Sequence, residues 1–579
     1  MHRRWFIRRT NPEYLAYLSR AVPVPPVVAQ ILINRGIKTA ADVCSFLNPG
    51  VTSLSDPYDL PGMAASVERI KVALARNQRV LIHGDYDADG LTATAIMVLA
   101  LREIGIDADY FIPNRLIHGY GFNPPAVDFA KKIGADLIIT VDCGITSFDT
   151  ADCAKKKGID VIITDHHEPL RQPEDTSHTS QVEGGFLIPS AVAVVNPKLS
   201  GPESQSSTLA GSGIAFKMVQ ALAMDGDVSL SPDDVLSFLD LVACGTIADV
   251  VTLTGENRAL VREGLPYITN PHRTGIRALK EVSGLQGREM KAGLLAFTIV
   301  PRMNAAGRMG DAGEVVRLFV SSSDEEALSI AEGLDRINKE RQRREEEVYQ
   351  EALLQLHREG YDRAIVLYGE GWHPGVIGIV ASRIAEECYR PVFVFAVEGD
   401  TVKGSARSIP CFDMYRGLSR CRDTLIAYGG HAQAAGLKLR AHDLPLFKER
   451  INSVVRESLQ DEDLIPALEI DAEVNLQGIT SSLIRDLSML EPFGFGNPEP
   501  LLGSRNLAVL NPRIVGNNHM KMRLRQGAFS IDAIGFDMGG LLESLDPSSP
   551  VDAAFTPMIN VWNGNQYLQL GLKGLRPGR

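Results

Sequence analysis

The sequence has few cysteines, and no two of them stand at metal-binding spacing. Seven cysteines occur in 579 residues, which is an odd number, and none falls in a C-x-x-C pair. Neither a disulfide framework nor a zinc site is therefore indicated. We expect a reducing, cytoplasmic setting.

Long apolar runs and an excess of positive charge are also missing. No run approaches the ~18 apolar residues of a membrane span, and Arg8-Arg9 leads into Thr10-Asn11-Pro12-Glu13 rather than an apolar signal core. A net charge of −12 argues against a nucleic-acid binder that works through overall positive charge, but leaves open one with a local basic groove. We expect a soluble protein that is not exported.

The length of 579 residues exceeds what one hydrophobic core supports, so roughly three or four domains are expected. Composition shifts and helical patterns place the boundaries. We predict a Pro-rich lead-in that packs on the first domain, a catalytic α/β domain, a connecting helix, a smaller α/β domain and a small all-β domain. Their ranges are 1–60, 61–323, 324–360, 361–465 and 466–579.

One stretch cannot be ordinary core: residues 83–90 read His-Gly-Asp-Tyr-Asp-Ala-Asp-Gly. Charged side chains are almost never buried unless they are paired or bind metal, so the three aspartates predict a cation site. An EF-hand fits the first acids but fails at its twelfth position, where Ile96 replaces the required Glu. An isolated acidic turn remains an alternative for this stretch alone.

The acidic stretch lies between a short β-branched run at 79–84 and an apolar helical pattern at 91–105. Further strands are expected at 108–112, 136–141 and 160–164, separated by helices at 124–133 and 147–157. This alternation predicts a parallel sheet covered by helices.

Two more of the expected strands run directly into polar residues, Asp142-Cys143-Gly144 and Asp165-His166-His167. Parallel strands place their carboxyl ends at one edge, so these residues should meet Asp87 and Asp89 in space. Each motif alone has a structural alternative, as a helix cap or a turn. Their coincidence at one sheet edge favours a functional site.

A fourth acid follows an apolar helix expected over 233–244. Asp249 stands in Gly-Thr-Ile-Ala-Asp-Val-Val, so we expect it to be buried and to need a partner. A metal ringed by the other acids is one partner, and a buried cap is the alternative.

The second half of the chain offers weaker signals. Residues 403–408 and 429–436 are expected to be glycine-rich loops, in which backbone amides, Arg407 and His431 could hold a phosphate. Residues 520–525 alternate strictly, so Lys521, Arg523 and Arg525 share one face of a strand. That face suits single-strand binding by a small barrel, and a solvated strand face is the equal alternative.

Taken in order, the motifs D-Y-D-A-D-G, V-D-C-G, T-D-H-H and G-T-I-A-D-V resemble motifs I to IV of the DHH phosphoesterase superfamily. The later P-R-M-N-A-A-G-R-M, G-G-H-A-Q-A-A-G and P-F-G-F-G-N-P-E-P resemble the RecJ-type single-strand-specific exonucleases. The resemblance covers nearly the whole chain and implies a parallel-sheet DHH domain, a DHH-associated domain and an OB-like barrel. It departs at 170–190, where an expected surface loop is longer than the family's usual link.

Carried over by position, the resemblance implies a two-metal site for Mn²⁺ or Mg²⁺. The implied metal ligands are His83, Asp87, Asp89, Asp142, His166 and Asp249, and the implied catalytic set adds Asp85 and His167. The implied substrate-binding residues are Arg302, Asn304, Arg308 and His431. To these the glycine-rich loop at 403–408 adds Arg407, and the strand pattern adds Lys521, Arg523 and Arg525.

The implied activity is hydrolysis of single-stranded DNA from an end, 5′ to 3′, to mononucleotides in DNA repair and recombination. A helicase and a single-strand-binding protein are implied partners, and a monomer is expected. Rivals are a related phosphodiesterase acting on short oligonucleotides or cyclic dinucleotides, a pyrophosphatase, and an inactive DNA-binding scaffold. The scaffold is disfavoured because it has no reason to keep so many costly charges.

Overall fold

The computed structural model describes residues 3–115, 117–171, 181–183, 185–201, 204, 206–562 and 565–578. Contacts divide the described chain into two compact units. The larger unit takes its residues from Trp5–Val300, Val315–Ala327 and Glu469–Arg579, and the smaller from Met1–Arg4, Pro301–Glu314 and Leu328–Leu468.

A five-stranded parallel sheet forms the centre of the first part of the larger unit, in the order β3-β2-β4-β5-β9. Its strands are β2 (Val80–Gly84), β3 (Ala108–Phe111), β4 (Leu137–Val141), β5 (Asp160–Thr164) and β9 (Ala193–Val195). Gly84 is in register with Val141, and Val141 with Thr164. The predicted strands are confirmed, and their carboxyl ends are level.

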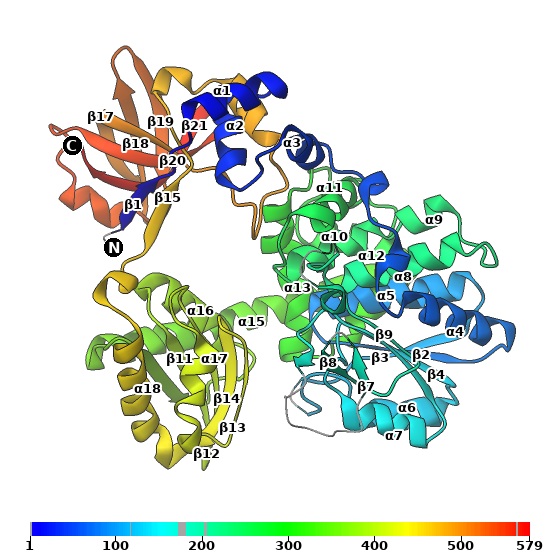
Figure 1. Cartoon of the computed structure of the whole chain (residues 1–579). Coiled ribbons are helices and arrows are strands. Elements are labelled where there is room, and N and C mark those ends of the chain that lie inside the picture. The colour runs from blue at the N-terminus through cyan, green and yellow to red at the C-terminus, as the bar shows by residue number, and fades with distance from the viewer. Residues whose placement is uncertain are drawn as a thin grey trace. The chain divides into compact units, whose positions relative to one another are not determined.

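Helices cover both faces of this sheet (Figure 1). The helices α4 (Met63–Ala75), α5 (Ala88–Glu103) and α8 (Gly211–Met224) lie on one face, and α6 (Pro124–Ile133) and α7 (Phe148–Lys156) on the other. The α5 helix is buried over nearly its whole length because α8 and α10 (Leu239–Ala248) also pack against it. The sheet edge is thereby enclosed by helix ends.

Further helices of this part are α9 (Pro232–Leu236), α11 (Gly255–Thr269), α12 (Thr274–Val282) and α14 (Gly313–Val320). The helix α13 (Ala292–Met309) begins here and belongs to the smaller unit from Pro301 on. The single helix expected over 233–244 is wrong, because the chain breaks after Leu236 and resumes as α10 at Leu239. As a result Gly245–Ala248 belong to a helix, and Asp249 is its C-cap.

The surface loop expected over 170–190 is also wrong in part. Three short strands, β6 (Leu170–Arg171), β7 (Gln181–Glu183) and β8 (Phe186–Ile188), form an antiparallel sheet in the order β6-β8-β7. Residues 172–180 and 184 of this prediction lie outside the described residues.

The C-terminal part of the larger unit is a closed five-stranded barrel. Its strands are β17 (Leu502–Val515), β18 (His519–Gln526), β19 (Phe529–Gly535), β21 (Asn565–Pro577) and β20 (Val551–Trp562), with β20 pairing back onto β17. The short β16 (Ala472–Glu473) extends one edge, and α19 (Ser481–Ser488) precedes β17. The sequence pattern predicts strands at 505–510, 513–516, 519–525, 529–535 and 566–572. The first two form the single strand β17, and β20 is a strand that the pattern does not indicate.

The N-terminal lead-in packs on two parts of the larger unit. Its helices lie on this barrel, whereas the stretch after them packs on the first domain as predicted, where the N–H of Ser55 donates to Glu256 at 2.7 Å and the hydroxyl of Tyr58 donates to the carbonyl of Ala221 at 3.1 Å. Its helices α1 (Pro12–Ala21), α2 (Pro26–Asn34) and α3 (Ala40–Leu47) share one hydrophobic core with the barrel strands, and β1 (Arg4–Ile7) pairs with β15 (Ala467–Ile470). Apolar side chains such as Leu18, Ile31 and Leu32 are fully buried there. Burial of that apolar surface decides where these helices lie.

Among the described residues no single helix has the length and apolar character to cross a membrane. The pair α1 and α2, bent by 112°, meets those criteria of length and composition only when counted together.

A mixed five-stranded sheet in the order β10-β11-β12-β14-β13 forms the smaller unit. Its strands are β10 (Ile365–Glu370), β11 (Val392–Glu398), β12 (Thr401–Arg407), β13 (Ala427–Gly430) and β14 (Ala434–Arg440), and its helices are α16 (Ile377–Cys388), α17 (Met414–Ser419) and α18 (Leu444–Ser458). Residues 403–407 and most of 429–436 are therefore strands rather than the loops we expected. Only the turn around His431 is outside a strand.

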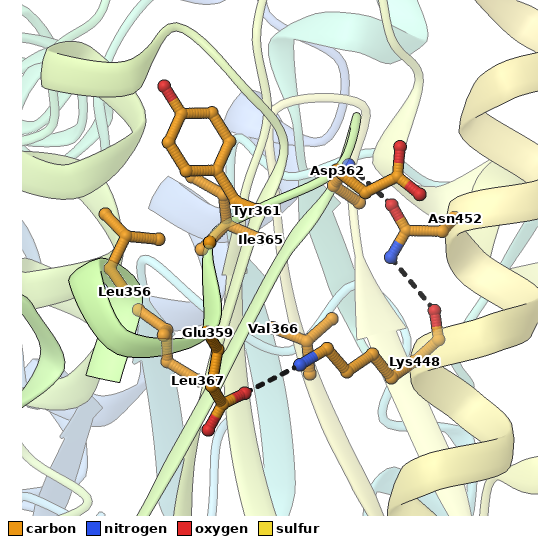
Figure 2. A pocket seen from close by; sticks show the side chains of 11 residues that line it. Leu356, Glu359, Tyr361, Asp362, Ile365, Val366, Leu367, Lys448 and Asn452 are labelled. Atoms are coloured by element: carbon orange, nitrogen blue, oxygen red, sulfur yellow. Dashed lines mark hydrogen bonds and ion pairs between the residues drawn. The ribbon is translucent and has the colours of Figure 1, made fainter.

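The long charged helix expected over 324–360 is α15 (Asp324–Glu359). Near its C-terminal end a cavity of about 450 Å³ lies between α15, β10 and α18 (Figure 2). In it Lys448 pairs with Glu359 at 3.0 Å, and Asn452 accepts the N–H of Ala364 at 2.9 Å. Gln355 accepts the N–H of Tyr368 in the same way. These side-chain amides occupy the outer edge of β10, which protects it from pairing with another strand.

Candidate metal centre

The first acids of the site lie at the junction of β2 and α5. Asp87 is the N-cap of α5, and its Oδ1 accepts the N–H groups of Asp89 and Gly90, each at 3.1 Å. A Cβ on Gly90 would lie 2.7 Å from the nitrogen of Asp85, so only glycine allows the turn to fold this closely. Helix capping thus presents three carboxylates at the sheet edge.

Asp89 is fully buried against the N-terminus of α8. Its two carboxylate oxygens accept the N–H groups of Gly211 at 2.6 Å and Ser212 at 3.0 Å. Even with these bonds, burial and the neighbouring Asp87 raise the pKa of Asp89 to about 6. Gly245 of α10 also approaches closely, since a Cβ there would lie 2.5 Å from Oδ1 of Asp89.

Asp142 follows β4 with a left-handed backbone, at φ +60°. Non-glycine residues adopt this conformation rarely, and aspartate and asparagine do so most readily. The side chain is 2% exposed and lies against Gly211, where a Cβ would come within 2.6 Å of it. Burial and the carboxylates of Asp89 and Asp87 raise its pKa well above the usual range.

His166 lies between two of the acids. Its Nε2 is 3.0 Å from Oδ1 of Asp142 and 3.5 Å from Oδ2 of Asp249. Both Nε2 of His166 and Oδ1 of Asp142 are buried, and neither has a hydrogen-bond partner of acceptable geometry among the described residues. Burial and the adjacent His167 lower the pKa of His166 to about 3, so its imidazole is neutral. A neutral imidazole beside unsatisfied carboxylate oxygens is the form that binds metal.

Asp249 is half-buried, with 23% of its side chain exposed, rather than buried as predicted. The C-terminal cap of α10 holds it at the rim of the site. Burial and the charges of Asp89 and Asp87 raise its pKa to about 9.

Three overlapping groups of side chains have ligand atoms within 4.8 Å of one another among the described residues. They are Asp142, His166 and His167; Asp89, His166 and Asp249; and Asp85, Asp87 and Asp142. Oδ1 of Asp85 is a further buried oxygen without a hydrogen-bond partner in that part of the chain. Hard carboxylate oxygens with imidazole are a donor set that fits Mn²⁺ or Mg²⁺. The crowded, unsatisfied acids therefore fit divalent cations.

His167 has a different environment from His166. Its Nδ1 lies 2.7 Å from Oδ1 of Asp165, which also accepts the N–H of His167, and the hydroxyl of Tyr120 is 2.9 Å from the same ring nitrogen. Burial alone would lower the pKa of His167, but the hydrogen bond to Asp165 and the nearby acids raise it to about 9.

Asp165 was expected at this sheet edge but without a catalytic or metal-binding role, and Tyr120 was not predicted at all. Asp165 directly follows β5, as Asp142 follows β4, which is the signal that places it at the edge. Tyr120 stands outside any strand end, and no pattern in the sequence indicates it.

His83, predicted as a ligand, is in none of the three groups found among the described residues. It is fully buried on β2, with its ring stacked on Phe111 at 5.7 Å and its Nε2 3.3 Å from the carbonyl of Gly121. Burial lowers its pKa to about 4, so the ring is neutral. Its Nδ1 is buried without a hydrogen-bond partner among the described residues, so a metal role stays a prediction.

Comparison with known proteins supports the same reading. Residues 79–246 match the DHH family, N-terminal domain, residues 362–457 the DHHA1 domain, and residues 470–574 the RecJ OB domain. The chain is 38% identical to the single-stranded-DNA-specific exonuclease RecJ of Bacillus subtilis, over 98% of this chain and 70% of that protein. The chain belongs to the RecJ family.

Two crystal structures of RecJ from Thermus thermophilus resemble the whole fold. The complex with Mn²⁺ matches with a TM-score of 0.84 and 34% identity, covering 100% of this chain and 80% of that one. The complex with Mg²⁺ matches with a TM-score of 0.79 and 32% identity, covering 100% and 79%. The predicted fold class, with DHH, DHH-associated and OB-like parts, is confirmed.

The remaining predicted site residues lie apart from the acids in the chain. Arg302 and Arg308 are in the smaller unit, where Arg302 pairs with Asp335 at 2.8 Å and Arg308 donates to the carbonyl of Gly375 at 3.2 Å. Asn304, between them on α13, is half-buried.

Arg407 and His431 belong to the sheet of the same unit. Arg407 ends β12 and donates to the hydroxyl of Ser382 at 3.0 Å. His431 lies exposed in the turn between β13 and β14. Beside it the Cβ positions of Gly429 and Gly436, which are paired across these strands, face open space.

The basic strand of the RecJ-type barrel is β18, and its three basic side chains differ in whether they form an ion pair. Arg523 pairs with Asp532 of β19 at 2.7 Å, which raises the pKa of Arg523. Among the described residues, no ion pair involves Lys521 or Arg525, which stand two positions to either side on the same strand face. Met520, Met522 and Leu524 are buried on the opposite face, so the predicted alternation is confirmed.

Proposed function

We propose that this RecJ-family chain is a metal-dependent exonuclease that hydrolyses single-stranded DNA, in DNA repair and recombination. One observation carries the proposal: Asp142 and His166 present buried, unsatisfied ligand atoms 3.0 Å apart among acids whose pKa values are raised. Removing one proton from such a cluster costs free energy unless a cation replaces it. The names of the relatives supply the substrate class, and the barrel is consistent with it.

Asp87, Asp89, Asp142, His166 and Asp249 would hold two divalent cations, Mn²⁺ or Mg²⁺. When bound, such a pair supplies Lewis acidity toward water and phosphate oxygens. His83 is the least supported ligand, because its ring is enclosed by aromatic side chains.

The protein's own groups would orient this chemistry. The amides of Gly211 and Ser212 fix the carboxylate of Asp89, so that its orientation does not depend on the cation. Asp165 fixes the ring of His167 and keeps it protonated near neutral pH. We propose that His167 donates a hydrogen bond to a phosphate oxygen of the strand, which would balance part of the charge that builds up during hydrolysis.

We further propose that Arg302, Asn304, Arg308, Arg407 and His431 contact phosphates of the strand. The open Cβ positions of Gly429 and Gly436 support this for His431, because a sugar-phosphate backbone can approach a glycine surface closely. Lys521, Arg523 and Arg525 would contact the strand on the barrel. Attack from the 5′ end, release of mononucleotides, action as a monomer, and cooperation with a helicase and a single-strand-binding protein are proposals from the family resemblance.

The decisive experiment uses single-stranded and double-stranded oligonucleotides labelled at either end, incubated with the protein and Mn²⁺ or Mg²⁺. We expect early release of labelled mononucleotide from the 5′ end of single strands, with duplexes degraded far more slowly. Release first from the 3′ end would overturn the direction. Cleavage of dinucleotides but not of longer strands would favour the small-substrate phosphodiesterase instead.

A further inference from the structure

An exposed aromatic side chain stands on a segment that binds the turn following Asp249, and the metal centre gives it no role. Phe495 lies in the segment between α19 and β17 and is 62% exposed. Exposing a phenyl group to water forgoes the stabilisation that its burial would bring. A single exposed apolar residue needs no explanation by itself. A role for Phe495 therefore rests on how the backbone on either side of it is anchored.

The segment is seated tightly on the turn that follows α10. The carbonyl of Phe495 accepts the N–H of Leu253 at 2.8 Å. A Cβ on Gly496, whose φ is +74°, would lie 2.6 Å from Thr252, so this position requires glycine, and a Cβ on Gly494 would lie 2.7 Å from the side chain of Leu253. The backbone contacts the turn through these glycines, while the phenyl ring between them is directed to solvent.

Buried polar side chains hold the same segment from behind. Nδ2 of Asn497, a fully buried residue, donates to the carbonyls of Leu490 and Pro492, each at 2.8 Å. Arg258 of α11 donates to the carbonyls of Leu490 at 2.9 Å and Glu491 at 2.7 Å. Because the backbone on both sides of Phe495 is anchored, the ring is presented from a rigid support.

The turn below is the one that carries a predicted metal ligand. Asp249 caps α10, Val250 follows with φ +58° and 62% exposure, and Thr252 and Leu253 form the seat of the segment. A β-branched residue with positive φ is rare, which indicates that the turn is held in this shape by its surroundings. Val250, directly after Asp249, and Phe495, whose carbonyl binds the N–H of Leu253, are therefore two exposed apolar side chains held by the same turn.

We infer that Phe495 is a base-stacking residue, which receives a nucleobase of the substrate strand next to the bond that is cut, with Val250 as an apolar neighbour. This inference rests on the proposed function. A strand whose phosphate is held at the carboxylates must place its bases within reach of the same rim, and every base offers a face that an aromatic ring can stack on. A stacked base would hold the strand without selecting its sequence.

The test compares Phe495→Ala, Phe495→Leu and Phe495→Trp with the unaltered chain, by steady-state cleavage of single-stranded oligonucleotides in Mn²⁺. Loss of one stacked base is expected to raise KM about tenfold for the Ala and Leu variants, with kcat changed by less than about twofold. The Trp variant should restore the original KM. Phe6→Ala, which removes a phenyl that is 49% exposed on β1, is the matched control and should change nothing.

A second measurement separates stacking from a structural effect. Oligonucleotides with one abasic site at successive positions from the digested end should show a loss of affinity at one position with the unaltered chain, and no further loss there with Phe495→Ala. An unchanged KM in Phe495→Ala, or an abasic penalty that persists in it, overturns the inference. If the Ala variant does not fold, as judged by thermal unfolding, the Leu and Trp variants decide in the same way. Absence of cleavage by the unaltered chain would instead overturn the proposed function.

Discussion

In the metal centre, carboxylates lie buried beside one another, whereas on β18 Arg523 and Arg525 are exposed, Lys521 is half-buried, and Arg523 is paired with Asp532. Crowding of like charges without neutralisation is costly, so the buried acids imply a ligand of opposite charge. An exposed charge that is solvated and paired with an opposite charge needs no further ligand, so it gives little evidence for one. The environment of a charged group is thus more informative than its presence in a motif.

The largest expected effect is at Asp142. Asp142→Asn keeps the left-handed backbone, which asparagine tolerates, but removes the anionic oxygen beside His166. Losing a ligand of the cations should lower kcat for single-stranded DNA about a thousandfold, measured with end-labelled oligonucleotides in Mn²⁺. Thermal unfolding should show that the variant remains folded.

Asp152→Asn, an exposed aspartate on α7, is the matched control and should retain full activity. Near-normal cleavage by Asp142→Asn would show that the buried acids do not hold a catalytic cation.

A second prediction concerns metal removal and pH. In the chain without cations, the pKa of Asp89 is about 6 and that of Asp249 about 9, compared with an ordinary value of 3.8. The folded state then binds these protons more tightly than the unfolded state, so their contribution to stability is complete below pH 3.8 and is lost as pH rises through 6 and 9.

Thermal unfolding in EDTA should therefore show Tm falling between pH 6 and 9, and the increase in Tm on adding Mn²⁺ should grow over the same range. Asp142→Asn should weaken that increase. A Tm gain from Mn²⁺ that is independent of pH would contradict the predicted competition between protons and cations.

The smallest effects are expected on the barrel. Lys521→Ala and Arg525→Ala should each weaken binding of single-stranded DNA about two- to fivefold and reduce the slope of log K against log salt by about 0.7. Arg523→Ala should do less, because Asp532 already neutralises that guanidinium. Fluorescence anisotropy of a labelled oligonucleotide at several salt concentrations measures the affinity and the salt slope of all three variants. An equal loss of affinity in the three variants would show that the ion pair of Arg523 and Asp532 opens when DNA binds.

The sequence was most predictive where chemistry and periodicity agreed. Residues 79–84, 136–141 and 160–164 are continuous apolar runs that end in acids or histidines, so both the strands and the convergence of their ends could be inferred. The turns of Asp87 and Asp142 follow from the same pattern. Local sequence also explains why α15 is a long charged helix, with Arg343 paired to Glu340 and Glu347.

What could not be predicted depends on contacts between distant parts of the chain. Nothing near Gly211 and Ser212 indicates that their amides bind Asp89, more than 120 residues earlier. The lead-in helices pack on the barrel because their apolar side chains, Leu18 among them, share one core with barrel residues such as Phe555, and no local pattern encodes that choice. The β20 strand was missed because Ala553, Ala554 and Phe555 are all buried, which removes the alternation that marks a half-exposed strand.

The guanidinium of Arg258 has a consequence for how such chains can be recombined in evolution or in the laboratory. It is nearly inaccessible and lies 3.9 Å from the ring centre of Phe46. Its hydrogen-bond acceptors among the described residues are backbone carbonyls of Phe46 in the lead-in and of residues 489–492. A chain cut between α18 and α19 would keep this charge and lose four of its acceptors. The barrel is therefore not a removable accessory, and exchange of modules at that point would have to replace Arg258 as well.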